Sequence, residues 1–527
     1  MNQFTAKYAS GVQGILSGFD RLVLRGTLRR LTHPSGMNSY LTLAKVPLKS
    51  FGEHVKEVTL RIRQASESLF QAAGRPVQYL ASSQQSKEEI ARRIAQQDGI
   101  TEGLICLLSC VEPCCSFEIS RDREAKLLRL VPRYRKCLHL YHYFIHPVFG
   151  FMSARLQTWF PLNLQVCING REWLARQMDR EGIGYARHDN CFSWIEDFGR
   201  AQALMQAQEI ADWDGLLEGI VRQLNPVHEQ LFADLRGSSY YWSVRQSEWA
   251  TDVCLKDASV LQRLYPKLIR HGLTALSSGD VMRFLGHSVC KDGCVRPSFE
   301  GEVLTDVKRR VEGIRIKHSV HTNSIKAYDK VYSAEGAVLR VETTLNDAER
   351  LKVKRTKITD PEGPKEWLSL RGGLIDLPLR GEACQRTNDR YLDALASADT
   401  SATLAELTEK LTRPTQLNGR RVRALNVFAP DDLALLQAVN HGEFVIGGLR
   451  NKDLQRLLFE TQPTCPQEAR RRSAYVGRKL RLLRAHGIIE KLPGQHLYHV
   501  TESGRLAATA VLTAHQAQIT QLWPKAA

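Results

Sequence analysis

Three neighbouring stretches in which apolar and polar residues alternate restrict the fold of this chain more than any other feature. They are "IRIKHSV" at 314–320, "SIKAYDKV" at 324–331 and "VLRVETTL" at 338–345. Successive side chains of a β-strand point to opposite faces, so alternation of this kind indicates strands with one apolar and one polar face. The short connections between the stretches predict adjacent antiparallel strands.

The polar face of this predicted sheet carries residues suited to phosphate chemistry. If the strands pair, it collects Arg315, Lys317, His321, Lys326, Tyr328, Lys330, Arg340 and Glu342. Lysine and arginine bind phosphates, a phenol can act as a nucleophile, and carboxylates and imidazoles bind divalent metals. We interpret the stretch either as an ordinary hairpin with a solvated face or as a nucleic-acid nicking site.

The charge of the chain favours a polyanionic partner. Its 527 residues carry 73 Lys or Arg against 56 Asp or Glu, a formal net charge of +17. Basic side chains displace counterions from phosphates, so we expect DNA or structured RNA as the partner. The longest aliphatic run, "GLICLLSC", is too short to span a bilayer, and the first residues lack a secretory pattern. We therefore expect a cytoplasmic protein with no membrane partner.

The order of helical and strand-like patterns along the chain predicts the α+β (mixed α/β) class, with central antiparallel sheets, helices and a C-terminal winged helix-turn-helix. Near the amino end, a strand, a helix capped by Ser86 and a buried strand suggest a parallel unit. The predicted parts are an N-terminal α/β domain with an antiparallel meander (1–199), a mainly helical segment (200–300), a central β-hairpin region that completes a nucleic-acid-binding sheet (301–350), a connector (351–428) and a winged helix domain (429–527).

The last hundred residues follow the order of a winged helix: three helices, two strands and a final helix. The stretch "LRLLRAHGIIEKLPGQHLYHVTESGR" resembles the helix-wing-helix end of MarR-like DNA-binding domains. Residues 465–491 include eight Lys or Arg and two Glu, and such a helix can bind phosphates or guanines in a major groove. The alternative is a protein-binding winged helix with a solvated basic face. The expected nucleic-acid contacts are Arg470, Arg471, Arg478, Lys479, Arg481 and Arg484.

The central strands also carry a family resemblance. "IKAYDK" followed by "LRVETTL" resembles rolling-circle replication initiators of the plasmid and filamentous-phage type. The resemblance implies a DNA-nicking enzyme of mobile elements, with Tyr328 as the nucleophile or its close neighbour and Glu342 as a metal or base residue. "FDRLVLRG" is similar to that family's first strand and makes Asp20 a third catalytic candidate. The implied cofactor is Mg²⁺ or Mn²⁺, with Glu342 and His321 as candidate ligands.

Two further groups contain residues that bind metals in other proteins. "HLYHYFIH" holds His139, His142 and His146, but on a strand His139 faces opposite to the other two, so we interpret them as core or edge histidines. Glu248 and Asp252 are one turn apart if their segment is helical. Such a pair can hold a metal, or it is simply an exposed pair on a helix.

Two functions of different classes follow from the sequence. The first is a metal-dependent DNA-nicking enzyme in which the winged helix finds the site and Tyr328 attacks. The second is a non-catalytic protein that binds DNA or a structured RNA through its polar face. The whole chain also resembles a group of bacterial proteins of similar length, which contributes no chemistry.

Overall fold

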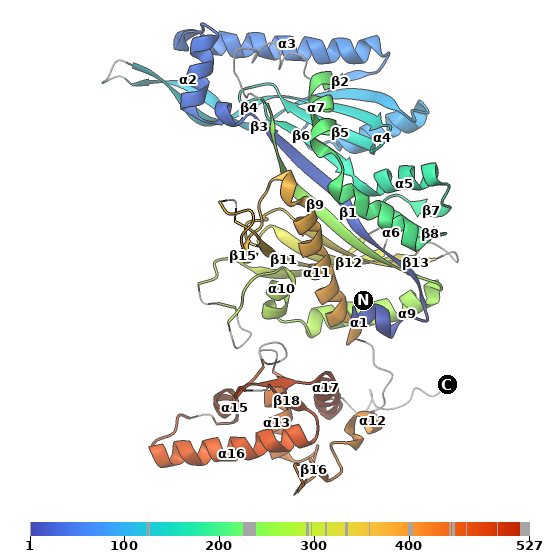
Figure 1. Cartoon of the computed structure of the whole chain (residues 1–527), viewed down its shortest axis with the longest axis vertical. Helices are drawn as coiled ribbons and strands as arrows, with labels where there is room; N and C mark the ends of the chain where they lie inside the picture. Colours follow the sequence, from blue (N-terminus) through green and yellow to red (C-terminus); the bar gives the residue numbers. More distant parts are fainter. Residues whose placement is uncertain are drawn as a thin grey trace. The chain divides into compact units, whose positions relative to one another are not determined.

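The chain forms two compact units in the computed structural model. Unit 1 comprises Met1–Gly11, Ser259–Asp329 and Asp389–Ala527, and unit 2 comprises Val12–Ala258 and Lys330–Asn388. A large mixed sheet, small antiparallel sheets and helices confirm the mixed α/β class (Figure 1). The structure describes residues 2–122, 124, 127–224, 239–290, 295–296, 298–310, 313–331, 336–357, 359–398, 404–441, 444, 448–459, 461–492 and 494–516.

Unit 2 is built on one twisted layer of strands. In spatial order they are β13 (Ala337–Leu345), β9 (Tyr241–Leu255), β1 (Val12–Thr27), β6 (Leu164–Asn169), β5 (Gly150–Gln157), β4 (Leu127–His146), β3 (Gly103–Asp122) and β2 (Val77–Tyr79). All neighbours are antiparallel except β2 and β3, which are parallel. The parallel strand–helix–strand unit predicted near the amino end is therefore confirmed. The predicted meander consists of fewer, longer strands, because β3 and β4 each run for 20 residues.

Helices cover both faces of this sheet (Figure 1). They include α2 (Pro34–Leu43), α3 (Phe51–Ala72), α4 (Lys87–Gln97), α5 (Gly170–Glu181), α6 (Phe198–Ala207) and α7 (Trp213–Leu224). On one face, His142 of β4 hydrogen-bonds through Nε2 to Ser66 of α3 at 3.0 Å. On the other, Glu88 of α4 lies 3.8 Å from Arg21 of β1. The strand registers align His142 with Leu24, three residues from Arg21 and hence on the opposite face.

Unit 1 contains the first two of the alternating strands. It is built on β10 (Val303–Arg310), β11 (Gly313–Val320) and β12 (Asn323–Val331, of which the last two residues belong to unit 2), with helices α9 (Ala258–Thr274) and α10 (Ser278–Phe284). Strands β10, β11 and β12 pair antiparallel in sequence order. Arg315 stands opposite Tyr328, and Lys317 opposite Lys326. These four side chains therefore share one face, as the alternation predicts.

Among the described residues from 430 onward, the C-terminal part of unit 1 has the predicted order of three helices, two strands and a final helix, and a further helix and two short strands precede them. Its elements are α12 (Leu404–Glu409), β16 (Thr415–Leu417), β17 (Arg420–Val422), α13 (Pro430–Val439), α15 (Asn451–Leu458), α16 (Pro466–Ala485), β18 (Ile489–Lys491), β19 (Tyr498–Val500) and α17 (Glu502–Gln516). They enclose a core of their own that includes Leu436, Val476 and Leu483. Winged-helix DNA binding stays a prediction. Within the described residues, none of the helices has both the length and the apolar character needed to cross a membrane.

Two stretches contain strands or helices that were not predicted from the sequence. Residues 241–255, in the middle of the segment predicted to be mainly helical, form strand β9. The turn-rich stretch 351–428 includes the long helix α11 (Leu377–Ala396) and the small sheet of β14 (Lys352–Arg355) and β15 (Glu366–Ser369). The segment of β9 is rich in Tyr, Trp, Val and Thr, which favour strands, and its pairing with both β1 and β13 puts it inside the sheet.

Candidate metal centre

Three carboxylates from neighbouring strands of unit 2 meet on one face of the sheet. Oxygen atoms of Asp20 on β1, Glu248 on β9 and Glu342 on β13 all lie within 4.8 Å of one another. Asp20 and Glu342 are catalytic candidates from the sequence, and the structure brings them together. Three carboxylates at this spacing provide the hard oxygen ligands that Mg²⁺ and Mn²⁺ prefer.

The register of β9 and β13 puts two of the carboxylates on the same face. Glu342 stands opposite Ala250, and Thr344 stands opposite Glu248. Because Glu248 and Ala250 are two residues apart on a strand, their side chains point to the same side. The signal that identifies Glu248 is therefore strand alternation, whereas the helical interpretation of this segment paired it with Asp252.

Asp20 joins them through a β-bulge in β1. Phe19 pairs with Trp249 and Arg21 pairs with Glu248, so Asp20 is an extra residue on its strand. A bulge re-aims side chains locally, and bulges occur often beside active sites. Nothing in the local sequence around Asp20 announces this irregularity, which depends on the pairing of β1 with a strand more than 200 residues away.

The carboxylate of Asp20 is buried and only half satisfied. Its side chain is 4% exposed. Its Oδ2 accepts hydrogen bonds from Asn190 Nδ2 at 2.7 Å and from Arg340 Nη1 at 3.3 Å. Its Oδ1 is buried and has no hydrogen-bond partner among the described residues. Such an oxygen is costly to bury unless a ligand supplies the missing interaction.

Burial raises the pKa of Asp20 above its usual value. The positive charge of Arg340 opposes this shift, and the nearby carboxylate of Glu342 adds to it. Like charges held at one point therefore disfavour full ionisation of the cluster. A bound divalent cation would reverse that balance, because it favours the ionised carboxylates.

An ion-pair network lies beside the cluster and holds its strands together. Arg340 of β13 donates to both oxygens of Asp252 on β9, at 2.6 and 3.0 Å, and to the backbone oxygen of Asn190 at 2.7 Å. Arg171 of α5 lies 3.2 Å from Asp252. Burial disfavours the charge on Asp252, but the two arginines outweigh it and its pKa is lowered. Asp252 is therefore committed to arginine and is absent from the carboxylate cluster.

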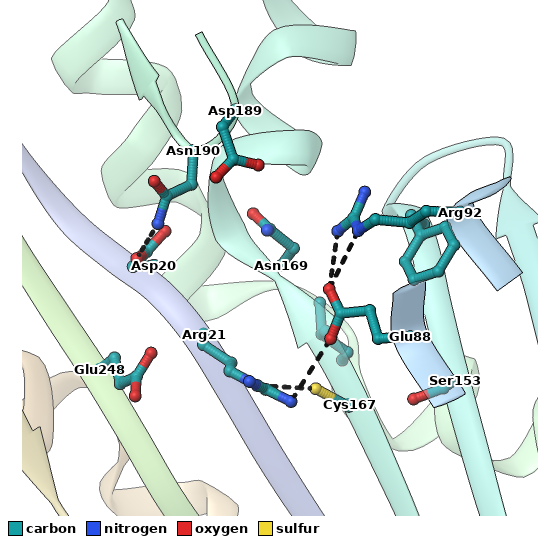
Figure 2. Close-up of a pocket in the computed structure, with 12 residues that line it drawn as sticks. Asp20, Arg21, Glu88, Arg92, Ser153, Cys167, Asn169, Asp189, Asn190 and Glu248 are labelled. Carbon is teal, nitrogen blue, oxygen red and sulfur yellow. Dashed lines mark hydrogen bonds and ion pairs between the residues drawn. The ribbon is translucent and has the colours of Figure 1, made fainter. Parts of the chain in front are cut away.

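A polar cavity of about 140 Å³ lies against the cluster (Figure 2). Its lining includes Asp20, Arg21, Glu88, Arg92, Cys167, Asn169, Asp189, Asn190 and Glu248. Figure 2 shows Glu88 between Arg92 and Arg21, at 3.0 and 3.8 Å. Arg21 also donates to the sulfur of Cys167 at 3.1 Å. A polar space of this size can hold several water molecules, so metal-bound waters or a phosphate oxygen can reach the carboxylates.

Two cations predicted to bind nucleic acid lie beside the cluster. Lys330 is 7% exposed, and its Nζ donates to Asn190 Oδ1 at 3.4 Å. Lys330 is therefore one amide group away from Asp20. Arg340 is 1% exposed and its guanidinium is held by carboxylates, so it organises the cluster and is not presented to solvent.

Unit 1 holds the other predicted residues of the central strands. They are Arg315, Lys317, Lys326 and Tyr328 on the strands and His321 in the turn between β11 and β12. Arg315 lies 3.3 Å from Asp306 of β10. Burial, followed by the charges of Lys326 and Arg315, lowers the pKa of Lys317. His321 has a positive φ of 51°, and its ring packs 5.0 Å from Phe299. The carboxylate cluster around Glu342 is completed by Asp20 and Glu248, and His321 is not a member of it.

The basic residues predicted on the third C-terminal helix differ in exposure. Exposed side chains on α16 are Arg470, Arg471, Arg478 and Arg481, and Arg484 is half-buried. Lys479 is 8% exposed and its Nζ lies 3.1 Å from Asp432. The arginines can therefore contact a polyanion, whereas Lys479 is held in a structural ion pair.

Sequence reasoning did not find the roles of Asn190 and Arg171, which orient the carboxylates from outside the strands that supply them. No local motif marks either residue. The chain has no match among protein-family models, curated proteins or solved structures. The geometry of the carboxylate cluster is consequently the main basis for assigning a function.

Proposed function

We propose that the protein is a divalent-metal-dependent enzyme that cleaves phosphodiester bonds in nucleic acids, with Asp20, Glu248 and Glu342 as the metal ligands. One observation carries the proposal: three strands bring an oxygen of each carboxylate within 4.8 Å of the other two. The buried Oδ1 of Asp20, which lacks a hydrogen-bond partner among the described residues, supports it. The net charge of +17 favours a polyanionic substrate.

The chemistry follows from the donor set. A Mg²⁺ or Mn²⁺ ion at the cluster would polarise a phosphate oxygen and offset charge in the transition state. Asn190 orients Asp20 through its side-chain amide, and Arg340 keeps β1, β9 and β13 in register through Asp20 and Asp252. Lys330, next to Asn190, adds positive charge close to the reacting phosphate.

Tyr328 is the proposed nucleophile if the reaction has a covalent intermediate. Its phenol oxygen would form a bond to phosphorus while the bond from phosphorus to the leaving sugar oxygen breaks, and the phenol proton would pass through solvent to that leaving oxygen. The half-buried ring lies on β12 beside the basic residues of β11. If water attacks in its place, cleavage proceeds without a protein–nucleic acid adduct.

A nicking assay on supercoiled plasmid tests the proposal. We expect wild-type protein to relax the plasmid in Mg²⁺ or Mn²⁺ and not in EDTA. Asp20→Asn, Glu248→Gln and Glu342→Gln should each lower the rate at least about tenfold, since amides bind hard cations poorly. Glu53→Gln, on the exposed surface of α3, is the matched control. Absence of metal-dependent cleavage of both plasmid and single-stranded substrates would remove the enzymatic proposal.

A second function, non-catalytic binding of nucleic acid, is favoured by the surface of the C-terminal part. A groove of about 350 Å³ lies beside α16 and is lined by Arg421, Arg423, Arg478 and Arg481, among others. This concentration of arginine suits phosphate groups. Tight binding without cleavage in any divalent metal would favour this function.

A further inference from the structure

A second polar cavity, of about 330 Å³, lies on unit 2. Three arginines from three strands line it: Arg25 of β1, Arg155 of β5 and Arg245 of β9. The lining also includes Gln165 of β6 and Tyr134 of β4. None of these residues belongs to the carboxylate cluster.

The two cavities share one face of the sheet. On β1, Arg21 lines the first cavity and Arg25 lines the second. Their partners on β6 are Asn169 and Gln165, with no shift of register between them, and Gln165 also pairs with Arg155. Residues four apart on a strand point to the same side. The separation along β1 is roughly 13 Å, at about 3.3 Å per residue.

The second cavity carries more positive charge than its neighbours neutralise. Among the described residues, neither Arg25 nor Arg245 has a carboxylate partner, and Arg245 donates only to the neutral amide of Gln165, at 3.0 Å. Arg155 lies 2.7 Å from Glu112, but its buried Nε has no partner. Glu112 is shared with Lys87 at 3.1 Å. Glu112 is therefore divided between two cations, and among the described residues it contacts neither Arg25 nor Arg245.

The buried imidazole of His139 also lines this cavity and contributes no charge to it. Burial, followed by the positive charge of Arg155, lowers the pKa of His139 to about 4. His139 is therefore neutral at physiological pH. Arg25 and Arg245, which lack a carboxylate partner among the described residues, and Arg155, whose buried Nε lacks a hydrogen-bond partner, together suit an anion with several acceptor oxygens.

We propose that this cavity binds a backbone phosphate of the same nucleic-acid strand whose scissile phosphate lies at Asp20, Glu248 and Glu342; this assignment rests on the proposed function. In this arrangement the nucleic-acid strand runs along β1 from the carboxylates to the arginines. A span of roughly 13 Å corresponds to a few nucleotides, which is within the size of single-strand binding sites. Tyr134 is 77% exposed at the cavity and offers a ring on which an unpaired base can stack. The substrate is therefore single-stranded around the cleaved bond.

The test uses the full-length protein and a labelled single-stranded oligonucleotide of about a dozen nucleotides, with binding measured by fluorescence anisotropy in EDTA. The variant Arg25→Gln/Arg245→Gln should weaken binding about tenfold or more and lower the slope of log affinity against log salt by about one. The control is Lys56→Gln/Arg63→Gln. It removes two exposed charges from α3, on the opposite face of the sheet, and should change affinity less than about threefold.

A scan with single methylphosphonate substitutions locates the contact. For wild-type protein, we expect loss of affinity when one phosphate a few nucleotides from the cleaved bond is made neutral. For Arg25→Gln/Arg245→Gln, the same substitution should have no further effect. Equal binding by this variant and the α3 control would overturn the site. Binding of inorganic phosphate at the arginines that is equally strong with and without the oligonucleotide would also overturn it.

Failure of this inference can be told apart from failure of the proposed function. If the arginine variant loses binding but no cleavage occurs in any divalent metal, the phosphate site stands and the enzymatic proposal fails. If cleavage occurs and the arginine variant binds like the control, the enzymatic proposal stands and the phosphate site fails. Equal thermal unfolding of wild type and both variants shows that the exposed substitutions leave the fold intact.

Discussion

Arg340 of β13 and Asp252 of β9 form a two-point ion pair, at 2.6 and 3.0 Å, in which neither side chain is more than 1% exposed. The pair stands beside the carboxylates of Asp20, Glu248 and Glu342 and belongs to the same strands. It takes one carboxylate out of reach of a metal and leaves three.

Loss of Arg340 should destabilise the protein strongly. Arg340→Met leaves Asp252 and Asp20 buried with less compensating charge. Breaking a buried ion pair in this way lowers the free energy of unfolding by about 3–5 kcal/mol. The free energy of unfolding from urea titration measures this. Arg350→Met removes an exposed pair with Asp347 and should cost less than about 1 kcal/mol. Equal effects of the two substitutions would contradict a structural role for the buried pair.

Metal-free protein should become more stable when Asp20 is made neutral. Burial raises the pKa of Asp20, so the folded state binds a proton more readily than the unfolded state does. The contribution of Asp20 to the free energy of unfolding is present at low pH and is lost as pH rises through the raised pKa. Asp20→Asn should therefore raise the melting temperature in EDTA at neutral pH, and the gain should shrink as pH falls. A gain that does not change with pH would refute this account.

Divalent metal should stabilise the wild-type protein and not the ligand variants. Ions that bind only the folded state raise the melting temperature with concentration. We expect such a rise with Mn²⁺ for wild type and none for Glu342→Gln or Glu248→Gln, while Glu53→Gln behaves like wild type. Asn190→Ala keeps all three carboxylates but removes the donor to Asp20, and should weaken metal affinity about 10–100-fold. Calorimetric titration with Mn²⁺ gives the affinities directly.

Tyr328 decides between attack by the protein and attack by water. If Tyr328 is the nucleophile, wild-type protein with single-stranded DNA and Mn²⁺ should yield an adduct that survives denaturation. Tyr328→Phe should abolish the adduct and leave binding intact. The control Tyr79→Phe changes an exposed tyrosine of β2 and should leave both the adduct and binding intact. Metal-dependent cleavage that persists in Tyr328→Phe would assign the attack to water.

The exposed arginines of α16 should contribute to affinity without contributing to chemistry. Arg478→Ala/Arg481→Ala should weaken binding to nucleic acid and lower the salt slope by up to about two, one for each lost phosphate contact. Single-turnover cleavage at saturating substrate should be unchanged. The control, Arg63→Ala/Arg350→Ala, removes the same charge from exposed pairs elsewhere. An unchanged salt slope would indicate that this helix faces protein or solvent.

The sequence by itself determined the local elements whose pattern is contained in neighbouring residues. Two-residue alternation defined β11, β12 and β13 and placed Arg315, Lys317, Lys326 and Tyr328 on one face. A cap at Ser86 and two apolar runs predicted the parallel pair of β2 and β3. In each case the deciding interactions lie within a few tens of residues, where periodicity reports them.

Only the tertiary structure decided which residues form the metal centre. Alternation assigned Arg340 to a polar face, but every residue of β13 is buried, so the arginine is held by carboxylates and is not available to phosphates. Asp20 reaches the cluster through a bulge that depends on β9, and Glu248 reaches it because its segment is a strand. A strand pattern defines two faces, but the segments that cover them, and the register of strands hundreds of residues apart, are set by packing of the whole unit.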